Sequence, residues 1–207
     1  MDRILIIGAG GHARACIDVI EKHAEYSIGG LVGFPDEVGK RILGYKVIGT
    51  NDDIPSLVSE YRNAMVCVGH IKTVKVRRRL FEKLRTCGFQ LPAIVSPLAY
   101  VSPHAEIGDG TIIMHHAVVN AGASVGRCSI VNSMSLVEHD AKVGDFCHVS
   151  TRAVLNGTVR IGSGTFVGSG AVVREGVSLG EDCFVAMGSV VTRDCACGTV
   201  FRLERNS

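Results

Sequence analysis

Aliphatic residues recur at every sixth position through the second half of the chain. Every sixth residue from Val95 to Val191 is Val, Ile or Leu. A repeat this short and regular is typical of a β-helix. We expect three repeats to form one triangular coil, so that residues i and i+18 stack as strands about 4.8 Å apart. A small or modest side chain, expected where the chain turns its corner, follows at Ala105, Thr111, Ala117, Ala123, Ser129, Ser135, Ala141, Cys147 and Ala153.

The first half of the chain alternates short apolar runs with amphipathic segments. Residues 4–7 form an apolar run, and residues 13–23 place their apolar side chains on one helix face. Such alternation favours a parallel sheet with helices on its faces. The expected strands are 4–7, 28–34, 46–48 and 64–68, and the expected helices are 13–23, 54–61 and 74–87. The predicted fold is an α/β Rossmann-like domain at 1–92, followed by a parallel β-helix of hexapeptide repeats at 93–207.

The composition narrows the possible partners. The 207 residues carry a formal net charge of +2, and aromatic residues make up only 5% of them, so neither nucleic acid nor a membrane surface is expected as a partner. We see no signal-peptide pattern and no membrane-length apolar stretch, and we expect a cytoplasmic protein with reduced cysteines. Cys195 and Cys197 lack the paired ligand spacing of a zinc site, so no metal is expected.

Three short sequences carry a resemblance to a known family. VNSMSLVEHD and VSTRAVLNG lie within the repeat, and GAGGHA follows the first predicted strand. With them, the chain resembles the left-handed β-helix acyltransferases, and among these the bacterial sugar acetyltransferases. That family includes UDP-amino-sugar N-acetyltransferases and NeuD-type sialic acid O-acetyltransferases. The resemblance spans nearly the whole chain and implies a left-handed β-helix, acetyl-CoA as co-substrate, a small-molecule sugar acceptor and a homotrimer.

His139 is the principal catalytic candidate. The repeat stacks it between Ala121 and Gly157, at a position that points outward, and these small neighbours leave an open notch where the backbone N–H of Gly157 can approach a bound carbonyl. Imidazole is the usual general base near neutral pH, and a carboxylate on its far nitrogen, from Glu138 or Asp140, fixes the tautomer. The alternative is a solvated surface histidine, which is common on a β-helix.

The resemblance assigns further roles. It matches Asp140 to the acidic partner of the base, gives His148 a contact with the acetyl donor, and lets the backbone at Gly157 help to hold the thioester carbonyl. A histidine at position 148 also favours the N-acetyltransferase branch. His139 and His148 lie half a coil apart, on different faces of one prism, so a site that uses both is predicted to lie between two subunits.

The glycine-rich turn is the candidate acceptor site. GAGGHA follows a strand and opens a helix, where backbone N–H groups and the helix dipole suit a phosphate. By resemblance the N-terminal domain binds a nucleotide sugar, with Gly10, Gly11 and His12 near its phosphates or sugar. Asp36 is a further candidate, although Phe34-Pro35 stands where family members often carry an Asp pair. The alternative is that the glycines only permit a tight turn.

Two neighbouring segments bear on the same site. The loop at Gly69-His70 ends the strand at 64–68 on the same sheet edge and is a candidate to face the sugar. Arg77, Arg78 and Arg79 are candidate phosphate partners, although a solvated helix face is the simpler interpretation.

The leading hypothesis is acetyl transfer from acetyl-CoA to the amine of a nucleotide-linked amino sugar. The alternative is O-acetylation of sialic acid or a related nonulosonic acid. A β-helical zinc hydratase would need three histidine ligands, including a pair five positions apart, and the chain has no such pair. A further alternative is a trimerising scaffold without enzymatic activity, in which the notch beside His139 would have no function. The tail lacks the Gly-x-Pro-Ala-Lys ending that usually lies near CoA in this fold.

Overall fold

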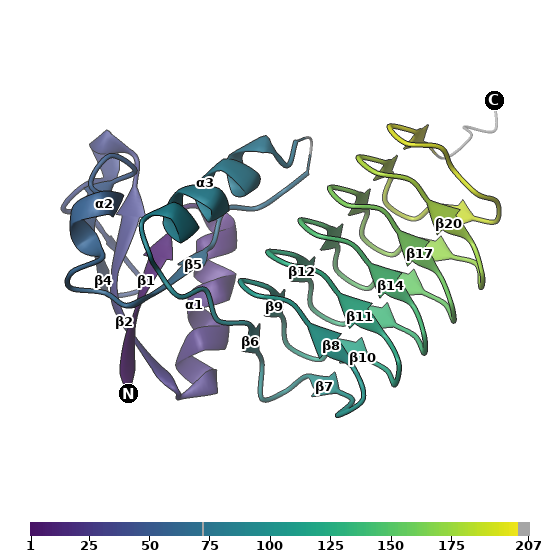
Figure 1. The fold of residues 1–207 in the computed structure, drawn as a ribbon, viewed down its shortest axis with the longest axis horizontal. Coiled ribbons are helices and arrows are strands. Elements are labelled where there is room, and N and C mark those ends of the chain that lie inside the picture. The colour runs from purple at the N-terminus through teal and green to yellow at the C-terminus, as the bar shows by residue number, and fades with distance from the viewer. Residues whose placement is uncertain (72, 203–207) are drawn as a thin grey trace. The chain divides into compact units, whose positions relative to one another are not determined.

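The structure is a computed structural model that describes residues 1–71 and 73–202 (Figure 1). The end of the tail, beyond residue 202, lies outside the described residues. The chain divides into two compact units. The first comprises Met1–Gly69 and Lys75–Ile94, and the second comprises His70–Val74 and the chain from Val95 onward. A short segment of the N-terminal half therefore packs with the C-terminal unit.

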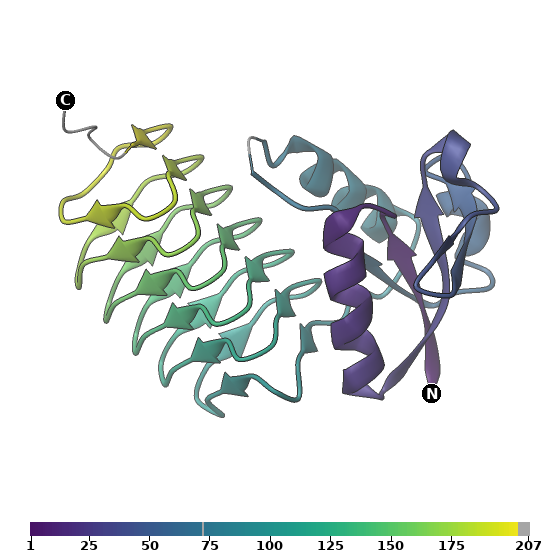
Figure 2. The ribbon, with the colours of Figure 1, turned by 180° about the vertical axis from the view of Figure 1, so that it is seen from behind.

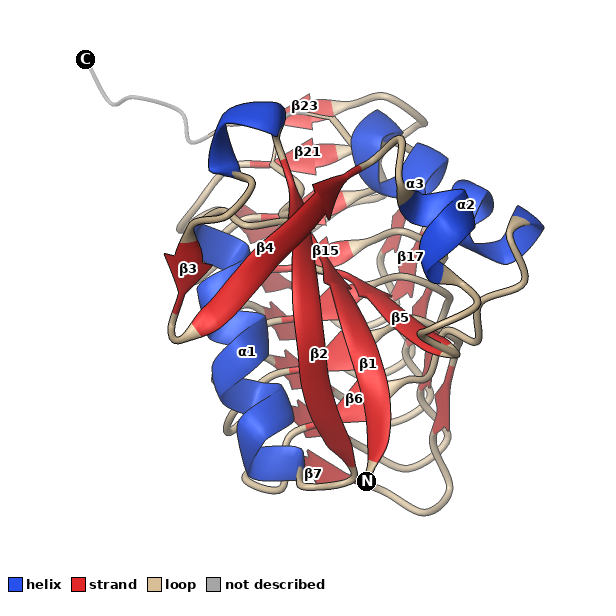
Figure 3. Ribbon diagram, turned by 90° about the vertical axis from the view of Figure 1, so that its left-hand side faces the viewer, coloured by secondary structure: helices blue, strands red, loops and turns tan. Residues whose placement is uncertain are grey.

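The first unit is built on a five-stranded sheet in the order β3-β4-β2-β1-β5 (Figure 3). Its strands are β1 (Asp2–Ile7), β2 (Tyr26–Gly33), β3 (Arg41–Ile42), β4 (Tyr45–Thr50) and β5 (Asn63–Val66). Its helices are α1 (Gly11–His23), α2 (Ile54–Leu57) and α3 (Lys75–Thr86), with a 3-10 turn at Pro35–Glu37. Four strands run parallel, as predicted, whereas β3 pairs antiparallel with β4 and was not predicted.

The helices cover both faces of this sheet. α1 and α3 lie on one face and α2 on the other (Figures 1 and 3). Right-handed crossovers explain why α1 and α2 lie on opposite faces of the sheet. The connection from β1 to β2 and the connection from β4 to β5 cross the sheet in opposite directions. The core contains Ile4–Ile7 and the predicted apolar face of α1, all fully buried. Among the described residues, no helix has the length and apolar character needed to cross a bilayer.

The second unit is a left-handed parallel β-helix whose coils stack along three sheets (Figure 2). The six-stranded sheet contains β7 (Tyr100–Val101), β10 (Val118–Val119), β13 (Leu136–Val137), β16 (Val154–Leu155), β19 (Val172–Val173) and β22 (Val190–Val191). The five-stranded sheet contains β8 (Glu106–Ile107), β11 (Ser124–Val125), β14 (Lys142–Val143), β17 (Arg160–Ile161) and β20 (Ser178–Leu179). The seven-stranded sheet contains β6 (Ile94–Val95), β9 (Ile112–Ile113), β12 (Ile130–Val131), β15 (His148–Val149), β18 (Phe166–Val167), β21 (Phe184–Val185) and β23 (Val200–Phe201).

The predicted register is confirmed by the strand pairing. Val119 pairs with Val137, and Val137 with Leu155, each one coil further along the chain. The aliphatic residue of each repeat points into the prism and forms its core. The small residue four positions later was expected to form the corner of the coil. Instead, it is buried inside the prism, as part of the core. The preceding residue makes the corner with a left-handed backbone, for example Asp140 with φ of 59° and Arg152 with φ of 58°.

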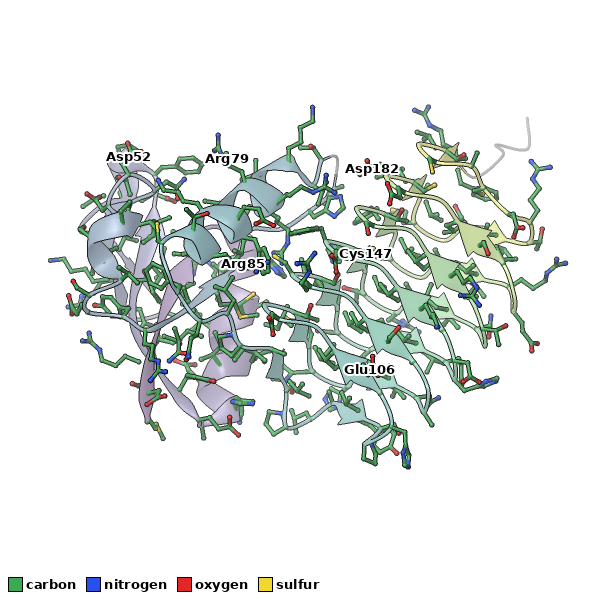
Figure 4. The ribbon with its side chains drawn as sticks, viewed as in Figure 1. Asp52, Arg79, Arg85, Glu106, Cys147 and Asp182 are labelled. Carbon is green, nitrogen blue, oxygen red and sulfur yellow. The ribbon has the colours of Figure 1, made fainter. Side chains whose placement is uncertain are left out.

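One corner of the prism contains a buried column of hydroxyl and thiol groups. Ser129 is typical, because its Oγ accepts the N–H of Cys147 at 2.9 Å and donates to the carbonyl of Gly144 at 3.0 Å. Burial raises the pKa of Cys147 (Figure 4) to about 12, so its thiol stays protonated and donates to the carbonyl of Gly162 at 3.2 Å. Each side chain thereby provides a hydrogen-bond partner for backbone N–H or C=O groups that strand pairing leaves unpaired. The column consists of Thr111, Ser129, Cys147, Thr165 and Cys183.

The column predicts a specific stability effect at Thr165, whose Oγ donates to Gly180 and accepts from Cys183. Thr165→Val keeps the shape but leaves both backbone groups without a partner, so we expect a loss of about 1–3 kcal/mol in unfolding free energy. Thr165→Ser keeps the bonds and is expected to lose less. Urea denaturation followed by circular dichroism measures both, with Thr199→Val as the exposed control. Equal stability of the Val and Ser variants would contradict this role.

Candidate active site

His139 lies at the corner between β13 and β14, where the repeat predicted it. Its carbonyl accepts the N–H of Thr158 at 3.0 Å, and the carbonyl of Ala121 accepts the N–H of Asp140 at 3.1 Å. The imidazole lies against Gly157 of the next coil. A Cβ at Gly157 would stand 2.6 Å from His139 Nε2, so only glycine leaves space for the ring. The predicted stack of Ala121, His139 and Gly157 is therefore present.

Asp140 holds the far nitrogen of the ring. Its Oδ2 lies 3.0 Å from His139 Nδ1, and this hydrogen bond, reinforced by the negative charge, raises the pKa of His139 above its ordinary value. Because a carboxylate only accepts, Nδ1 carries the hydrogen and Nε2 is left as the basic nitrogen. Gly122 makes room for this carboxylate, since it has φ of 72° and a Cβ there would collide with Asp140 Oδ1.

Glu138 has a different task from Asp140. Its Oε2 accepts the side-chain N–H of Asn120 at 2.9 Å and the backbone N–H of His139 at 3.0 Å. The bond from Asn120 is the main reason why the pKa of Glu138 is lowered. Of the two carboxylates that the sequence left open as partners of the ring, the structure therefore places Asp140 on the imidazole and Glu138 on the backbone beneath it.

The backbone at Gly157 differs from the expectation in one respect. The residue is buried rather than exposed, because the imidazole of His139 covers it. Within residues 1–71 and 73–202, nothing accepts a hydrogen bond from the Gly157 N–H. A buried N–H without a partner is rare and costly, so this group is a donor available to a ligand oxygen beside the basic nitrogen.

His148 lies on β15, in a different sheet from the strand that precedes His139. It is buried, with 6% exposure. Its Nδ1 donates to the carbonyl of His70 at 2.6 Å, so its Nε2 must accept from Asn132 Nδ2 at 3.1 Å. The Asn132 orientation is fixed in turn, since its Oδ1 accepts the N–H of Ser133 at 2.8 Å. Sequence reasoning placed His70 toward the sugar and missed its contact with His148, because no local pattern marks a contact across 78 positions. It also missed Asn132 as a partner of His148. The contact of His148 with an acetyl donor stays a prediction.

Two adjoining cavities lie inside the first unit, and the first of them opens at the glycine-rich turn. The first, of about 280 Å³, is lined by Gly10, Gly11 and His12 from the turn, by Val68-Gly69, and by Arg79. The second, of about 380 Å³, shares Arg79 and Phe34 with it. The first turn of α1 has no side-chain cap, so its N–H groups and the cation of Arg79 (Figure 4) suit an anionic ligand.

The glycines of the turn divide into two kinds. Gly8 has φ of 124°, and a Cβ there would stand 3.1 Å from the carbonyl oxygen of Cys67, so the fold itself requires glycine. At Gly10 and Gly11 a Cβ would meet no atom within 4 Å. A tight turn therefore explains Gly8 but not the other two, whose bare backbone faces the cavity.

Other expected substrate contacts fall elsewhere. Asp36 lies on the exposed 3-10 turn, 3.9 Å from Lys40, and does not line either cavity, because Pro35–Glu37 carries it away from the strand end. His70 belongs to the second unit rather than to the sugar side. Arg77 is fully buried and structural, whereas Arg79 lines both cavities, so the solvated helix face was too simple an interpretation.

Each half of the chain matches a known protein-family model. The family model of the PglD N-terminal domain matches residues 3–84, and that of the hexapeptide repeat of succinyl-transferase matches residues 158–193. No curated protein sequence matches the chain.

Solved structures match almost the whole chain. Perosamine N-acetyltransferase from Caulobacter crescentus, in complex with CoA and GDP-perosamine, is 31% identical, with 95% of this chain and 92% of that chain covered and a TM-score of 0.88. The acetyltransferase domain of PglB from Neisseria gonorrhoeae, in complex with acetyl coenzyme A, is 34% identical, with 95% and 93% covered and a TM-score of 0.87. The chain belongs to the bacterial sugar acetyltransferases of the hexapeptide-repeat superfamily. The resemblance seen in the sequence is thereby confirmed.

A more distant solved structure has the same fold as this chain. WeeI from Acinetobacter baumannii is 22% identical, with 99% and 98% covered and a TM-score of 0.85. Within the described part of the acetyltransferase, no cluster of three or more His, Cys, Asp or Glu residues could hold a metal ion.

The His139–Asp140 pair predicts a pH dependence for the sugar acetyltransferase. A general base works only when deprotonated, and the carboxylate raises the pKa of His139 by stabilising its protonated form. Asp140→Asn should therefore move the acidic limb of kcat/KM to lower pH and lower its plateau. Glu175→Gln is the control, since Glu175 acts on the ring only weakly. If the acidic limb of the kcat/KM profile does not move in Asp140→Asn, Asp140 does not control the pKa of the catalytic base.

Proposed function

We propose that the chain transfers the acetyl group of acetyl-CoA to the amine of a nucleotide-linked amino sugar. The observation that carries the proposal is the position of His139 Nε2, directly beside the Gly157 backbone and with Nδ1 held by Asp140. The relatives support the substrate class, because one solved relative is an N-acetyltransferase in complex with CoA and a nucleotide-linked amino sugar. O-acetylation of a sialic acid is the alternative outcome of the test below.

The mechanism follows from the two groups at the corner. His139 Nε2 takes a proton from the sugar amine as its nitrogen attacks the thioester carbon. Nδ1–H stays bonded to Asp140, which stabilises the imidazolium that forms. The Gly157 backbone lies beside Nε2, and in this mechanism its N–H donates to the carbonyl oxygen as negative charge develops there. Collapse of the tetrahedral intermediate breaks the C–S bond, and the imidazolium gives its proton to the departing sulfur, so that CoA leaves as the free thiol and His139 returns to its neutral form.

The acceptor is held, in this proposal, by the cavities of the first unit. The diphosphate binds at the first turn of α1, against Gly10, Gly11 and the cation of Arg79. Lys83 lines the second cavity and supplies further positive charge, while its Nζ donates to the carbonyl of Asn51 at 2.6 Å. Phe34 is 69% exposed beside both cavities and offers a flat apolar surface to a nucleobase.

A homotrimer is part of the proposal, and the outer face of the six-stranded sheet supports it. Every outward side chain of this sheet is apolar, whereas the neighbouring five-stranded sheet presents charged and small polar groups. His139 lies on the corner between these two sheets, so a second copy against the apolar face would border the site. We also propose a cytoplasmic location, where acetyl-CoA is available. The apolar column is Tyr100, Val118, Leu136, Val154, Val172 and Val190.

Release of free thiol from acetyl-CoA tests the function, with UDP- and GDP-linked amino sugars and free sialic acids as acceptors. We expect turnover with a nucleotide-linked amino sugar. His139→Ala should lower kcat by roughly 10²–10⁴, the usual contribution of a general base. His104→Ala, in a different coil, is the matched control. Wild-type kcat in His139→Ala, or turnover with sialic acid alone, would overturn the assignment.

Gly11→Val tests the acceptor site. A Cβ at this position meets no atom of the protein within 4 Å, so we expect the melting temperature to stay close to that of the wild type. It should obstruct a bound phosphate and raise KM for the sugar, while KM for acetyl-CoA is unchanged. Gly8→Ala is the structural control and should lower the melting temperature. A raised KM for acetyl-CoA alone would mean that the two substrates have been assigned to the wrong units.

Subunit complementation tests the shared cleft. His139→Ala and His148→Ala chains, each expected to lose most of its activity alone, are mixed, exchanged and reassembled. If one subunit supplies the base and its neighbour supplies His148, hybrid sites with both histidines should restore part of the activity. Absence of recovery, with exchange demonstrated by mass spectrometry, would count against a site between subunits.

A further inference from the structure

The second cavity of the first unit is lined by a turn that carries a carboxylate without a partner. Thr50 ends β4, Asn51 and Asp52 follow it, and all three line this cavity. Among the residues that the structure describes, neither the Asn51 side chain nor the Asp52 carboxylate makes a hydrogen bond or an ion pair. The acetyl transfer described above gives Asp52 no role. A charged group with unused hydrogen-bonding capacity therefore lies at the cavity.

The backbone of this turn is fixed by the side chains around it. Asp53 Oδ2 accepts the backbone N–H of Thr50 at 2.7 Å and its hydroxyl group at 3.0 Å. The hydroxyl oxygen of Thr50 in turn accepts the N–H of Asp52 at 3.3 Å. Lys83 Nζ donates to the carbonyl of Asn51 at 2.6 Å. Asp53 thus serves the turn itself, whereas Asp52 is presented on a fixed backbone with its carboxylate available to a ligand.

Phe34 supplies an aromatic face at the same cavity. It is 69% exposed. Glu37 Oε2 accepts the backbone N–H of Phe34 at 2.8 Å, and Pro35 follows directly, so the backbone that carries the ring is also fixed. An aromatic ring stacks on any nucleobase, because every base has a π-face. Selection among the bases must therefore come from a polar group at the cavity.

A carboxylate distinguishes the nucleobases by their hydrogen-bonding edges. It only accepts hydrogen bonds, through two oxygens that lie side by side. Guanine presents two adjacent donors, N1–H and the 2-amino group, which one carboxylate can accept together. Uracil presents a single donor, N3–H, between two carbonyl oxygens. Adenine and cytosine place a ring nitrogen with a lone pair beside their amino group. A carboxylate therefore favours guanine and is repelled by part of the edge of each other base.

We propose that Asp52 selects a guanine nucleotide by accepting hydrogen bonds from N1–H and the 2-amino group while Phe34 stacks on the base. The proposal rests on the acceptor site proposed above. Arg79 lines both cavities, so a diphosphate beside it leaves the second cavity to the nucleoside. Figure 4 shows Asp52 and Arg79 along the same edge of the first unit. The other polar residues that line only the second cavity, Thr50 and Lys83, already bond to the turn.

Calorimetry with GDP, UDP and inosine diphosphate tests the selection in the wild-type protein. Inosine diphosphate is GDP without the 2-amino group, so it keeps the stacking surface and loses one of the two hydrogen bonds. We expect GDP to bind about tenfold to a hundredfold more tightly than UDP, with inosine diphosphate between them. If UDP or inosine diphosphate binds as tightly as GDP, the proposal is overturned. This comparison needs no variant, so it decides the matter even if a variant folds poorly.

Asp52→Asn changes the hydrogen-bonding pattern and keeps the shape. We expect its affinity for GDP to fall about tenfold or more, and we expect it to bind xanthosine diphosphate more tightly than GDP. The new amide N–H can donate to the 2-oxo group that xanthine carries in place of the amino group. A residue that only supported the turn would weaken all nucleotides alike. Asp36→Asn is the matched control, because it removes a carboxylate that lines neither cavity.

The outcomes separate this proposal from the acceptor site on which it rests. Unchanged GDP affinity in Asp52→Asn, or an equal loss in Asp36→Asn, overturns the role of Asp52. If the wild-type protein binds UDP more tightly than GDP, guanine selection is overturned, while the acceptor site and the acetyl transfer stand. If it binds none of the three nucleotides, the proposed acceptor site fails and the selection fails with it.

Discussion

Stacking of each residue on the residue one coil earlier is the constraint on which the β-helix and its site depend. A slip of one residue would turn the aliphatic side chains outward and the polar ones inward. It would also break the buried column from Thr111 to Cys183, which satisfies backbone groups at one corner. The same offset lays Gly157 against His139 and brings Asn120 to Glu138. The periodicity of the fold, rather than a dedicated loop, positions the candidate base.

Features that follow from this periodicity could be predicted from the sequence. The core, the parallel pairing and the neighbours of His139 all follow from counting residues along the chain. Local alternation similarly predicted four parallel strands and the buried face of α1. Counting could not show that the small residues lie inside the core, because a repeat gives the spacing of residues but not the backbone angle of each corner.

Contacts between distant segments escaped the sequence for a physical reason. His148 reaches the carbonyl of His70, which lies 78 positions earlier, and no local pattern encodes such a pairing. Arg77 stands in a run of basic residues that resembles a solvated helix face, yet it is the one that is fully buried. Likewise, Gly8 and Gly11 look equivalent in the sequence. Only the space around each separates a glycine that the backbone requires from one whose N–H faces a cavity.

Asp140 occupies a turn position that the neighbouring coils of the prism share. Its column also contains Gly122, Thr158 and Gly176, with φ of 72°, 60° and 71°. A carboxylate can enter this column without changing the path of the backbone, provided that the coil before it leaves space, as Gly122 does. The His–Asp pair could therefore be placed at the equivalent positions of another coil. Such substitutions would move the pair by one or more coils, in steps of one strand spacing, about 4.8 Å, without redesigning the fold.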